Sequence, residues 1–481
     1  MHKIKRLINC VLPLTMCNFK CHYCYLSQEK AFNKNIPKLK YDLDTIQKAL
    51  RIERLGGTCL VNLCAVGETM MAPYIIELTK RMLENGHYVA IVTNGSITNK
   101  FKQLCNFSEE ERSKLFIKFS YQYLELKRLN LIDVFFENVG MIKKAKISYT
   151  IEVTANDETI DYIDELSSLC IKRIGAKPHV IESRNNNNSY KKLTKLKNKE
   201  HMKKWNTLNS PAIKFQDKQW GEKRKEFCYA GDWEMNLYLE TGNFTTCFAG
   251  GPCNQNIFED IEEPLHFCAV GNKCPWDHCF ASHVLLTMGI IPELEAPSYD
   301  KIRNRKNEDG TEWLQSDVKK FFQSKFIDNN KEYNQDKKNI INWYRDIEQN
   351  SKSNYTSKIA KSLEKILKSK NIKKIAIHEN GKFSDSLNKV LEKTSINIKY
   401  VLSSNYYESK SSLKQYLLHK NKYILKKILR PKQVPVLNYY DKLPNVDAII
   451  VTDLMNFSKI KTNLKKITKQ KVILITDLDM E

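Results

Sequence analysis

The sequence predicts an α/β protein in which a parallel sheet or barrel is followed by a second, smaller α/β domain. Its 481 residues exceed what one hydrophobic core usually supports, and 42% of them are hydrophobic, so several domains with sizeable cores are expected. Strand-like and helix-like segments alternate up to about residue 182, and the alternation returns from about Lys358. Alternating βα units favour parallel strands that bind ligands at their carboxyl ends.

The predicted strands are short apolar runs, and the predicted helices between them show a 3.6-residue apolar periodicity. In the first part, strands are expected at residues 3–12, 59–66, 88–95, 115–121, 147–154 and 176–183, and helices at 43–56, 74–86, 131–145 and 159–175. In the last part, strands are expected at 373–381, 398–404, 446–453 and 470–479, and helices at 363–370 and 383–394. The pattern predicts six βα units followed by a Rossmann-like domain.

The chain is basic, with a formal net charge of +23. We attribute this excess to solvated helix faces in a chain rich in lysine, asparagine and isoleucine, which argues against a nucleic-acid partner. The N-terminus imitates a lipoprotein signal, but Met16 is bulky where cleavage needs a small residue, and Asn9 and Pro13 break the apolar run. No apolar run of about 18 residues occurs. No membrane span is predicted, and a cytoplasmic location is expected.

Three cysteines, Cys17, Cys21 and Cys24, directly follow the first predicted strand with the spacing C-x3-C-x2-C. A structural zinc site usually takes four ligands, so a set of three suggests a metal centre with one open position. In a four-iron cluster, three thiolates can hold three irons and leave the fourth open to a small-molecule chelate. Two alternatives stay open. The three positions also share one face of a helix, as structural cysteines would, and distant cysteines could complete a zinc site.

This motif closely resembles that of the radical S-adenosylmethionine superfamily. The resemblance implies a partial (β/α)6 TIM-like barrel and a 4Fe-4S cluster that cleaves bound S-adenosylmethionine to a 5'-deoxyadenosyl radical, with flavodoxin or ferredoxin as reductant. The positions that match the family's cofactor contacts are Tyr23, Gly67, Glu68, Asn94 and Ser120. A carboxylate such as Glu68 would pair the cofactor's ammonium group. The match is partial because a valine precedes Gly67 where the family usually has another glycine.

A second group of cysteines lies between Cys228 and Cys279. Its opening pattern, C-x13-G-x4-C, looks like the start of a SPASM or twitch extension, which implies further 4Fe-4S clusters. The continuation departs from a full SPASM motif, so one auxiliary cluster is expected instead of two. The expected metal ligands are Cys228, Cys247, Cys268, Cys274 and Cys279, and the favoured set joins the first three to one of the last two. A zinc ribbon is the alternative, because zinc would suit the same cysteines.

Other polar residues are weaker candidates. Glu152 and His179, near the ends of later strands, are either substrate contacts or satisfied core groups, and His278 and His283 could replace a thiolate ligand. In the C-terminal domain only Gly381 stands where a Rossmann fold carries G-x-G-x-x-G, so a docking or substrate-presenting role is expected. The sequence singles out no catalytic residue.

The expected layout is a radical S-adenosylmethionine barrel at residues 1–225, a SPASM-like or twitch-like cysteine-rich auxiliary cluster domain at 226–300, a helical connector at 301–355 and a Rossmann-like domain at 356–481. The expected function is that of an oxidoreductase or mutase-type enzyme that abstracts hydrogen from a sugar or nucleotide-linked sugar of cell-surface glycan biosynthesis, since no leader-binding domain precedes the barrel. The alternatives are a maturase of ribosomally made peptides and a non-catalytic, zinc-containing nucleic-acid-binding protein.

Overall fold

The computed structural model divides the chain into two compact units. The larger unit comprises Met1–Pro252, Asn256–Leu265 and Cys274–Lys331, and the smaller comprises Cys253–Gln255, His266–Lys273 and Glu332–Glu481. The structure describes residues 2–186, 191–247, 252–348, 356–378, 386–387, 389–391, 394–402, 436–437, 443–453 and 457–477. Gly381 lies outside the described residues. The domain boundaries expected from the sequence remain predictions.

The larger unit is built on a nine-stranded sheet with the strand order β6-β5-β4-β3-β2-β1-β7-β8-β9. Its strands are β1 (Leu7–Leu12), β2 (Leu60–Ala65), β3 (Tyr88–Thr93), β4 (Leu115–Ser120), β5 (Ser148–Ala155), β6 (His179–Glu182), β7 (Glu234–Tyr238), β8 (Asn243–Thr245) and β9 (Pro252–Asn256). The first seven strands pair in parallel and the last two add antiparallel pairs. Six consecutive strands in spatial order confirm the predicted α/β fold with its (β/α)6 arrangement.

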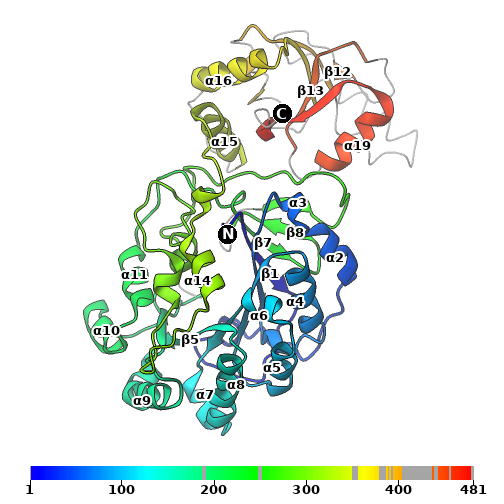
Figure 1. Cartoon of the computed structure of the whole chain (residues 1–481). Coiled ribbons are helices and arrows are strands. Elements are labelled where there is room, and N and C mark those ends of the chain that lie inside the picture. Colours follow the sequence, from blue (N-terminus) through cyan, green and yellow to red (C-terminus); the bar gives the residue numbers. More distant parts are fainter. Residues whose placement is uncertain are drawn as a thin grey trace. The chain divides into compact units, whose positions relative to one another are not determined.

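Helices follow the strands and surround the sheet (Figure 1). They are α1 (Tyr25–Gln28), α2 (Leu43–Ala49), α3 (Ile52–Leu55), α4 (Ile75–Glu84), α5 (Thr98–Cys105), α6 (Glu109–Ser113), α7 (Tyr123–Arg128), α8 (Ile132–Lys144), α9 (Ile163–Ile174), α10 (Asn198–Trp205), α11 (Pro211–Gln219), α12 (Ser282–Leu285), α13 (Tyr299–Arg303) and α14 (Ser316–Gln323). The outer face of the strands packs on them: Phe119 of β4, for example, contacts Phe101 of α5 and Phe135 of α8. These side chains build the core between sheet and helices.

The helix expected at residues 43–56 is wrong as a single element, because the chain breaks it into α2 and α3. Arg51 is extended, with φ −66° and ψ 150°. The carbonyl of Leu50, which a continuous helix would use internally, instead contacts Asn85 Nδ2 at 3.2 Å and His87 Nε2 at 2.7 Å. Side chains from a distant loop thus satisfy this backbone group and end the helix.

Two elements beyond the six βα units complete the larger unit. Strand β7, from the stretch assigned to the auxiliary domain, pairs in parallel with β1. Helix α14, from the stretch assigned to the connector, covers the amino ends of β3 and β4: Phe321 stacks on Tyr88 with ring centroids 3.8 Å apart, and Phe322 meets Phe116 edge-on at 5.1 Å. The amino ends of these strands are closed, which leaves the carboxyl ends for ligands.

The smaller unit contains a five-stranded parallel sheet with the order β12-β11-β10-β13-β14. Its elements are α15 (Gln335–Glu348), α16 (Thr356–Ser369), β10 (Lys374–His378), β11 (Asn397–Leu402), β12 (Val436–Leu437), β13 (Ala448–Val451), α19 (Phe457–Ile467) and β14 (Lys471–Leu474). The order reverses between β10 and β13, as in doubly wound nucleotide-binding folds. The predicted Rossmann-like topology is confirmed, and β12 is a strand that the sequence did not predict.

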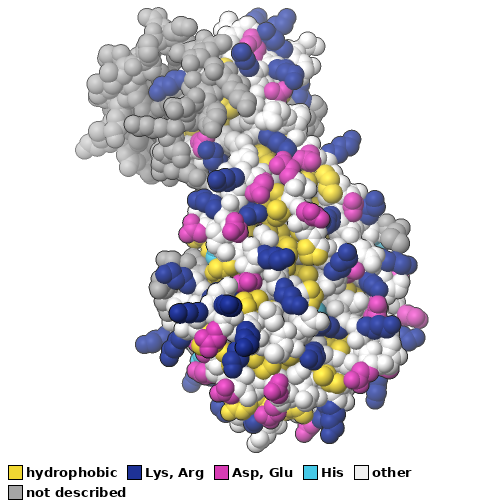
Figure 2. Space-filling view, turned by 90° about the vertical axis from the view of Figure 1, so that its left-hand side faces the viewer, with side chains coloured by type: hydrophobic (Ala, Val, Ile, Leu, Met, Phe, Trp, Pro, Cys, Tyr) yellow, Lys and Arg dark blue, Asp and Glu magenta, His cyan; other side chains and the backbone are white. Residues whose placement is uncertain are grey.

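The surface agrees with the view that the basic excess is spread over solvated faces. On the face shown in Figure 2, lysine and arginine side chains alternate with acidic ones and with uncharged surface. Many of the described lysines pair with acidic neighbours, as Lys127 does with Glu165 at 3.0 Å. Among the described helices, none is both long and apolar enough to cross a membrane.

Candidate functional site

The three N-terminal cysteines lie in a loop at the carboxyl end of β1. Residues 17–24 form no helix, and α1 begins only at Tyr25, with Cys24 as its extended N-cap residue. A turn closes the loop, since the Cys24 N–H donates to the carbonyl of Cys21 at 3.1 Å. The alternative of three structural cysteines along one helix face is therefore wrong.

The end of β2 holds this loop in place through backbone contacts. The Gly67 N–H donates to the Leu14 carbonyl at 2.7 Å, and the Glu68 N–H donates to the Met16 carbonyl at 2.9 Å. The Tyr25 hydroxyl donates to the carbonyl of Val66 at 2.6 Å. Two strand ends that are neighbours in the sheet are thus joined directly above it, which positions Cys17 beside Glu68.

Replacing Gly67 with alanine is expected to disturb this junction. A Cβ atom there would lie 2.1 Å from the Met16 carbonyl oxygen and 2.7 Å from its carbon, so the backbone of the cysteine loop must shift. We expect a loss of about 1 to 3 kcal/mol in unfolding free energy and less iron bound per chain. Denaturant unfolding and iron analysis measure both. Gly140→Ala is the control, because nothing lies within 4 Å of that Cβ in α8; a similar loss in both variants would contradict the role of Gly67.

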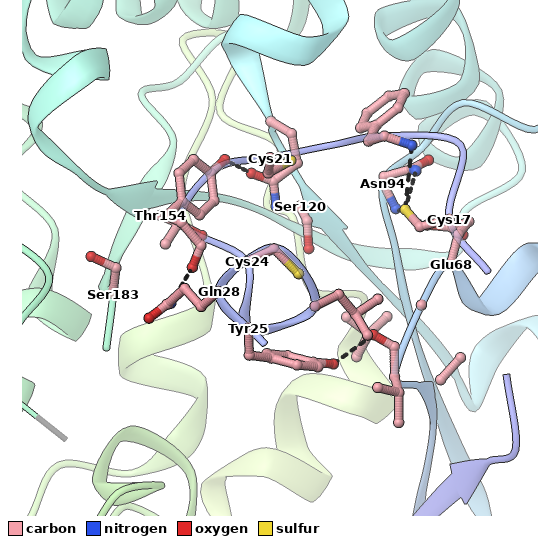
Figure 3. A pocket seen from close by; sticks show the side chains of 18 of the residues that line it. Cys17, Cys21, Cys24, Tyr25, Gln28, Glu68, Asn94, Ser120, Thr154 and Ser183 are labelled. Carbon is pink, nitrogen blue, oxygen red and sulfur yellow. Dashed lines mark hydrogen bonds between the residues drawn. The ribbon is translucent and has the colours of Figure 1, made fainter. Parts of the chain in front are cut away.

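One cavity collects the residues that the sequence placed at the site. Its volume is about 290 Å³, and it lies at the carboxyl ends of the barrel strands. Its lining includes neither Glu152 nor His179, but it includes the eight residues of the first domain expected to hold the metal or the cofactor: Cys17, Cys21, Tyr23, Cys24, Gly67, Glu68, Asn94 and Ser120. Figure 3 shows the cysteines around the same space as Glu68, Asn94 and Ser120. The candidates come from four segments far apart in sequence, so their convergence is a property of the fold.

Glu68 is buried, and both of its carboxylate oxygens accept hydrogen bonds. Oε1 accepts from the Thr93 hydroxyl at 2.6 Å and from the Met70 N–H at 2.9 Å, and Oε2 accepts from the Asn94 N–H at 2.7 Å. Burial raises the pKa of Glu68, while these bonds lower it in part. A carboxylate offers about four acceptor sites, so three internal bonds leave room for one more donor.

The thiols of the loop are possible metal ligands. Burial raises the pKa of Cys17 to about 11 and that of Cys21 to about 12, and a thiol binds metal as the deprotonated thiolate. In the described part of the chain, no three His, Cys, Asp or Glu side chains converge closely enough to hold one metal ion. A four-iron cluster takes one thiolate per iron, so three thiolates leave the fourth iron open. Three thiols of one loop are a donor set that fits such a cluster.

The cavity also contains residues that the sequence reasoning missed. They lie in α1, near the end of β5, or just after β4 and β6: Gln28, Thr154, Gln122, Ser183 and Arg184. Gln28 Nε2 donates to the carbonyls of Tyr23 and Arg184, both at 3.0 Å, and thereby joins the cysteine loop to the end of β6. For all of them except Gln28, a position at or just after the end of a predicted strand was the signal that could have found them.

Four cysteines of the second group are electrostatic neighbours. Burial is the main cause that raises the pKa of the Cys228 thiol, and the nearby Cys279 and Cys274 raise it further. Burial is also the main cause that raises the pKa of Cys279, and Cys247 and Cys274 raise it further. Cys268 belongs to the smaller unit, where its thiol faces the carbonyl of Ala269 at 3.9 Å. The larger unit thus brings together Cys228, Cys247, Cys274 and Cys279, and it does not contain Cys268.

The histidine candidates lie outside the cavity lining. His179 is buried near Trp313, and burial lowers its pKa to about 3. His278 packs between Trp220 and Phe280, with ring centroids 4.6 and 4.7 Å away. Nδ1 of His283 lies 2.9 Å from Nε2 of Gln216.

Comparison with known proteins finds similarity among solved structures. No protein-family model and no curated protein matches the chain. SuiB of Streptococcus suis bound to the precursor peptide SuiA is 17% identical with a TM-score of 0.39, over 54% of this chain and 64% of that one. Native anSMEcpe with bound AdoMet is 15% identical with a TM-score of 0.37, over 53% of this chain and 78% of that one. TYW1 with a lysine-pyruvate adduct is 17% identical with a TM-score of 0.26, over 34% of this chain and 60% of that one. The chain thus spans less than two thirds of the matched SuiB chain, and similarities this loose say nothing of what it binds.

Proposed function

We propose that this chain is a radical S-adenosylmethionine enzyme. The observation that carries the proposal is the loop of Cys17, Cys21 and Cys24, which shares one cavity with the carboxyl ends of the barrel strands. When bound, a reduced 4Fe-4S cluster supplies the electron that cleaves S-adenosylmethionine to a 5'-deoxyadenosyl radical. The chain's own residues hold the cluster, orient the cofactor and limit the access of water.

The cofactor contacts in this proposal follow from the polar groups around the cavity. Glu68 would accept the cofactor's ammonium group at its remaining acceptor site, because a buried carboxylate stabilises a cation that has left water. Thr93 and Asn94 hold that carboxylate toward the cavity. Tyr23 and Ser120 line the same space and would contact the rest of the cofactor.

For the second cysteine group we propose one auxiliary 4Fe-4S cluster held by Cys228, Cys247, Cys274 and Cys279. This set revises the one favoured from the sequence, because these four cysteines belong to one compact unit and, after burial, neighbouring thiols of the set raise the pKa of Cys228 and Cys279. A zinc ribbon held by the same cysteines is the alternative, and iron, sulfide and zinc analysis distinguishes the two.

The substrate class stays a proposal in two forms, a sugar or nucleotide-linked sugar and, alternatively, a peptide. Anaerobically purified and reconstituted protein is expected to be brown, to contain iron and sulfide, and to form 5'-deoxyadenosine from S-adenosylmethionine after reduction. Nucleotide sugars and a peptide library, added separately, distinguish the two forms by mass change of the substrate. Colourless protein that holds zinc but no iron, and that binds DNA with a steep salt dependence, would replace the enzyme with a nucleic-acid binder.

A further inference from the structure

A charged cluster lies on the inner face of the barrel, one layer below the cavity. Side chains alternate along a strand, so Lys118 and Ser120 of β4 share a face, and Phe119 between them points outward to the helices. Ser120 lines the cavity. Glu152 and Thr154 of β5 are related in the same way, since Thr154 also lines the cavity. Lys118 and Glu152 therefore lie at the next level inside the barrel.

Three residues form the cluster. Lys118 Nζ lies 2.9 Å from Glu152 Oε2, and Arg303 of α13 pairs with Glu152 Oε1. The side chain of Arg303 is 0% exposed and that of Glu152 2%, whereas Lys118 keeps 17% of its side chain exposed. Because the outer face of β4 is covered by helices, the exposed part of the Lys118 side chain faces the barrel interior, below the residues that line the cavity.

By formal charge the cluster has two cations and one carboxylate, and burial together with the neighbouring Arg303 lowers the pKa of Lys118. In the part of the chain that the structure describes, neither Lys118 nor Arg303 has a second carboxylate within 4 Å. Arg303 Nε and Nη2 also have no hydrogen-bond partner among the described residues. Buried donors and charges without partners cost free energy, because they have lost their contacts with water. A ligand that supplies acceptors to them recovers part of that free energy. Arg184 adds a further guanidinium at the cavity wall.

We propose that Lys118 and Arg303 bind an oxyanion group of the substrate, a carboxylate or a phosphate, and that Glu152 holds the two cations in position. Such a group offers the acceptors that the guanidinium and ammonium donors lack, through charge-assisted hydrogen bonds. The inference rests on the proposed function, because that function makes the barrel interior the substrate side of the cofactor cavity. It deepens that proposal by requiring an anionic substrate.

The alternative role for the cluster is purely structural, since it joins β4 and β5 to α13. Ligand binding separates the two roles, because a structural tie does not create a saturable anion site. The probes are pyrophosphate and succinate, titrated calorimetrically into the full chain at fixed ionic strength with sodium chloride as the balancing salt. We expect saturable binding of one of them in about the millimolar range or tighter. The one that binds identifies the group as phosphate or carboxylate.

Two lysine variants test the assignment. Lys118→Met is expected to weaken binding of that probe about tenfold or more, and Lys118→Arg to retain it. Lys127→Met is the matched control, because Lys127 lies on α7 with its side chain 47% exposed and paired to Glu165. Equal affinity in wild type and Lys118→Met would overturn the proposal. The proposal would also be overturned if neither anion bound saturably to the wild type. That result does not require Lys118→Met to fold.

The titration distinguishes this inference from the proposed function because it needs no cluster. It is made on iron-free protein and repeated after reconstitution. Anion binding that depends on Lys118, in a chain that takes up no iron, would support the anion site and contradict the radical enzyme. Iron uptake and 5'-deoxyadenosine formation without anion binding would support the enzyme and contradict the anion site.

Discussion

Replacing Cys17, Cys21 and Cys24 together with alanine is expected to abolish 5'-deoxyadenosine formation. The three thiols line one cavity and hold three irons of the proposed cluster, so no other group in that cavity replaces them. About four irons per chain should remain, because the auxiliary cluster has its own thiolates. Iron and sulfide analysis, electron paramagnetic resonance of the reduced protein and chromatography of 5'-deoxyadenosine measure the outcome.

Cys105→Ala is the matched control for the triple variant. Cys105 lies on α5, where its thiol contacts the carbonyl of Met141 at 3.8 Å, and it does not line the cavity. The control should keep both the iron content and the radical chemistry of wild type. If the triple variant still made 5'-deoxyadenosine at the wild-type rate, the loop would not hold the reactive cluster. If it retained only zinc, the auxiliary cluster would be disproved.

Replacing Cys228 and Cys279 with alanine is expected to have the converse effect. The protein should lose about four irons and its turnover of substrate, while uncoupled formation of 5'-deoxyadenosine at the first cluster survives. The two clusters use different cysteines. Substrate turnover therefore depends on the auxiliary cluster, whereas formation of 5'-deoxyadenosine at the first cluster does not. Mössbauer or electron paramagnetic resonance spectra, together with the iron count, report which cluster remains.

Cys268→Ala distinguishes two ligand sets: the set proposed from the structure, which lacks Cys268, and the set favoured by the sequence, which includes it. Cys268 belongs to the smaller unit, whereas Cys228, Cys247, Cys274 and Cys279 belong to the larger one. We expect Cys268→Ala to keep the full iron content, apart from a small change in stability from the buried thiol. Loss of about four irons in this variant would restore Cys268 as a ligand and contradict the revised set.

The fold could be predicted largely because its signals are local. Each strand of the barrel is a short apolar run, and each helix between strands has its own periodicity, so the alternation is visible without any contact. Continuous burial on β3, where five of six residues are buried, is typical of a parallel strand covered on both faces. The interrupted helix at Leu50 was not predictable, because its cause is Asn85 and His87, side chains from another segment.

The candidate site was predictable where chemistry is concentrated in a motif. The spacing of Cys17, Cys21 and Cys24 restricted the choice of metal centre, and the strand before them placed them at a strand end. The cluster around Lys118 has no motif. Lys118 is one of 78 basic residues in the sequence, and nothing in its neighbours along the chain marks it as buried.

By itself, the sequence determined the class of fold, the position of the cysteine loop after β1 and the presence of a second parallel domain, because periodicity and ligand spacing are written in neighbouring residues. Only the tertiary structure decided that β7 joins β1, that Cys268 belongs to the smaller unit, and that Lys118 and Arg303 share Glu152. Each of these depends on contacts between residues far apart in the chain. Such contacts are selected by burial, strand register and charge pairing in three dimensions, which a one-dimensional pattern does not contain.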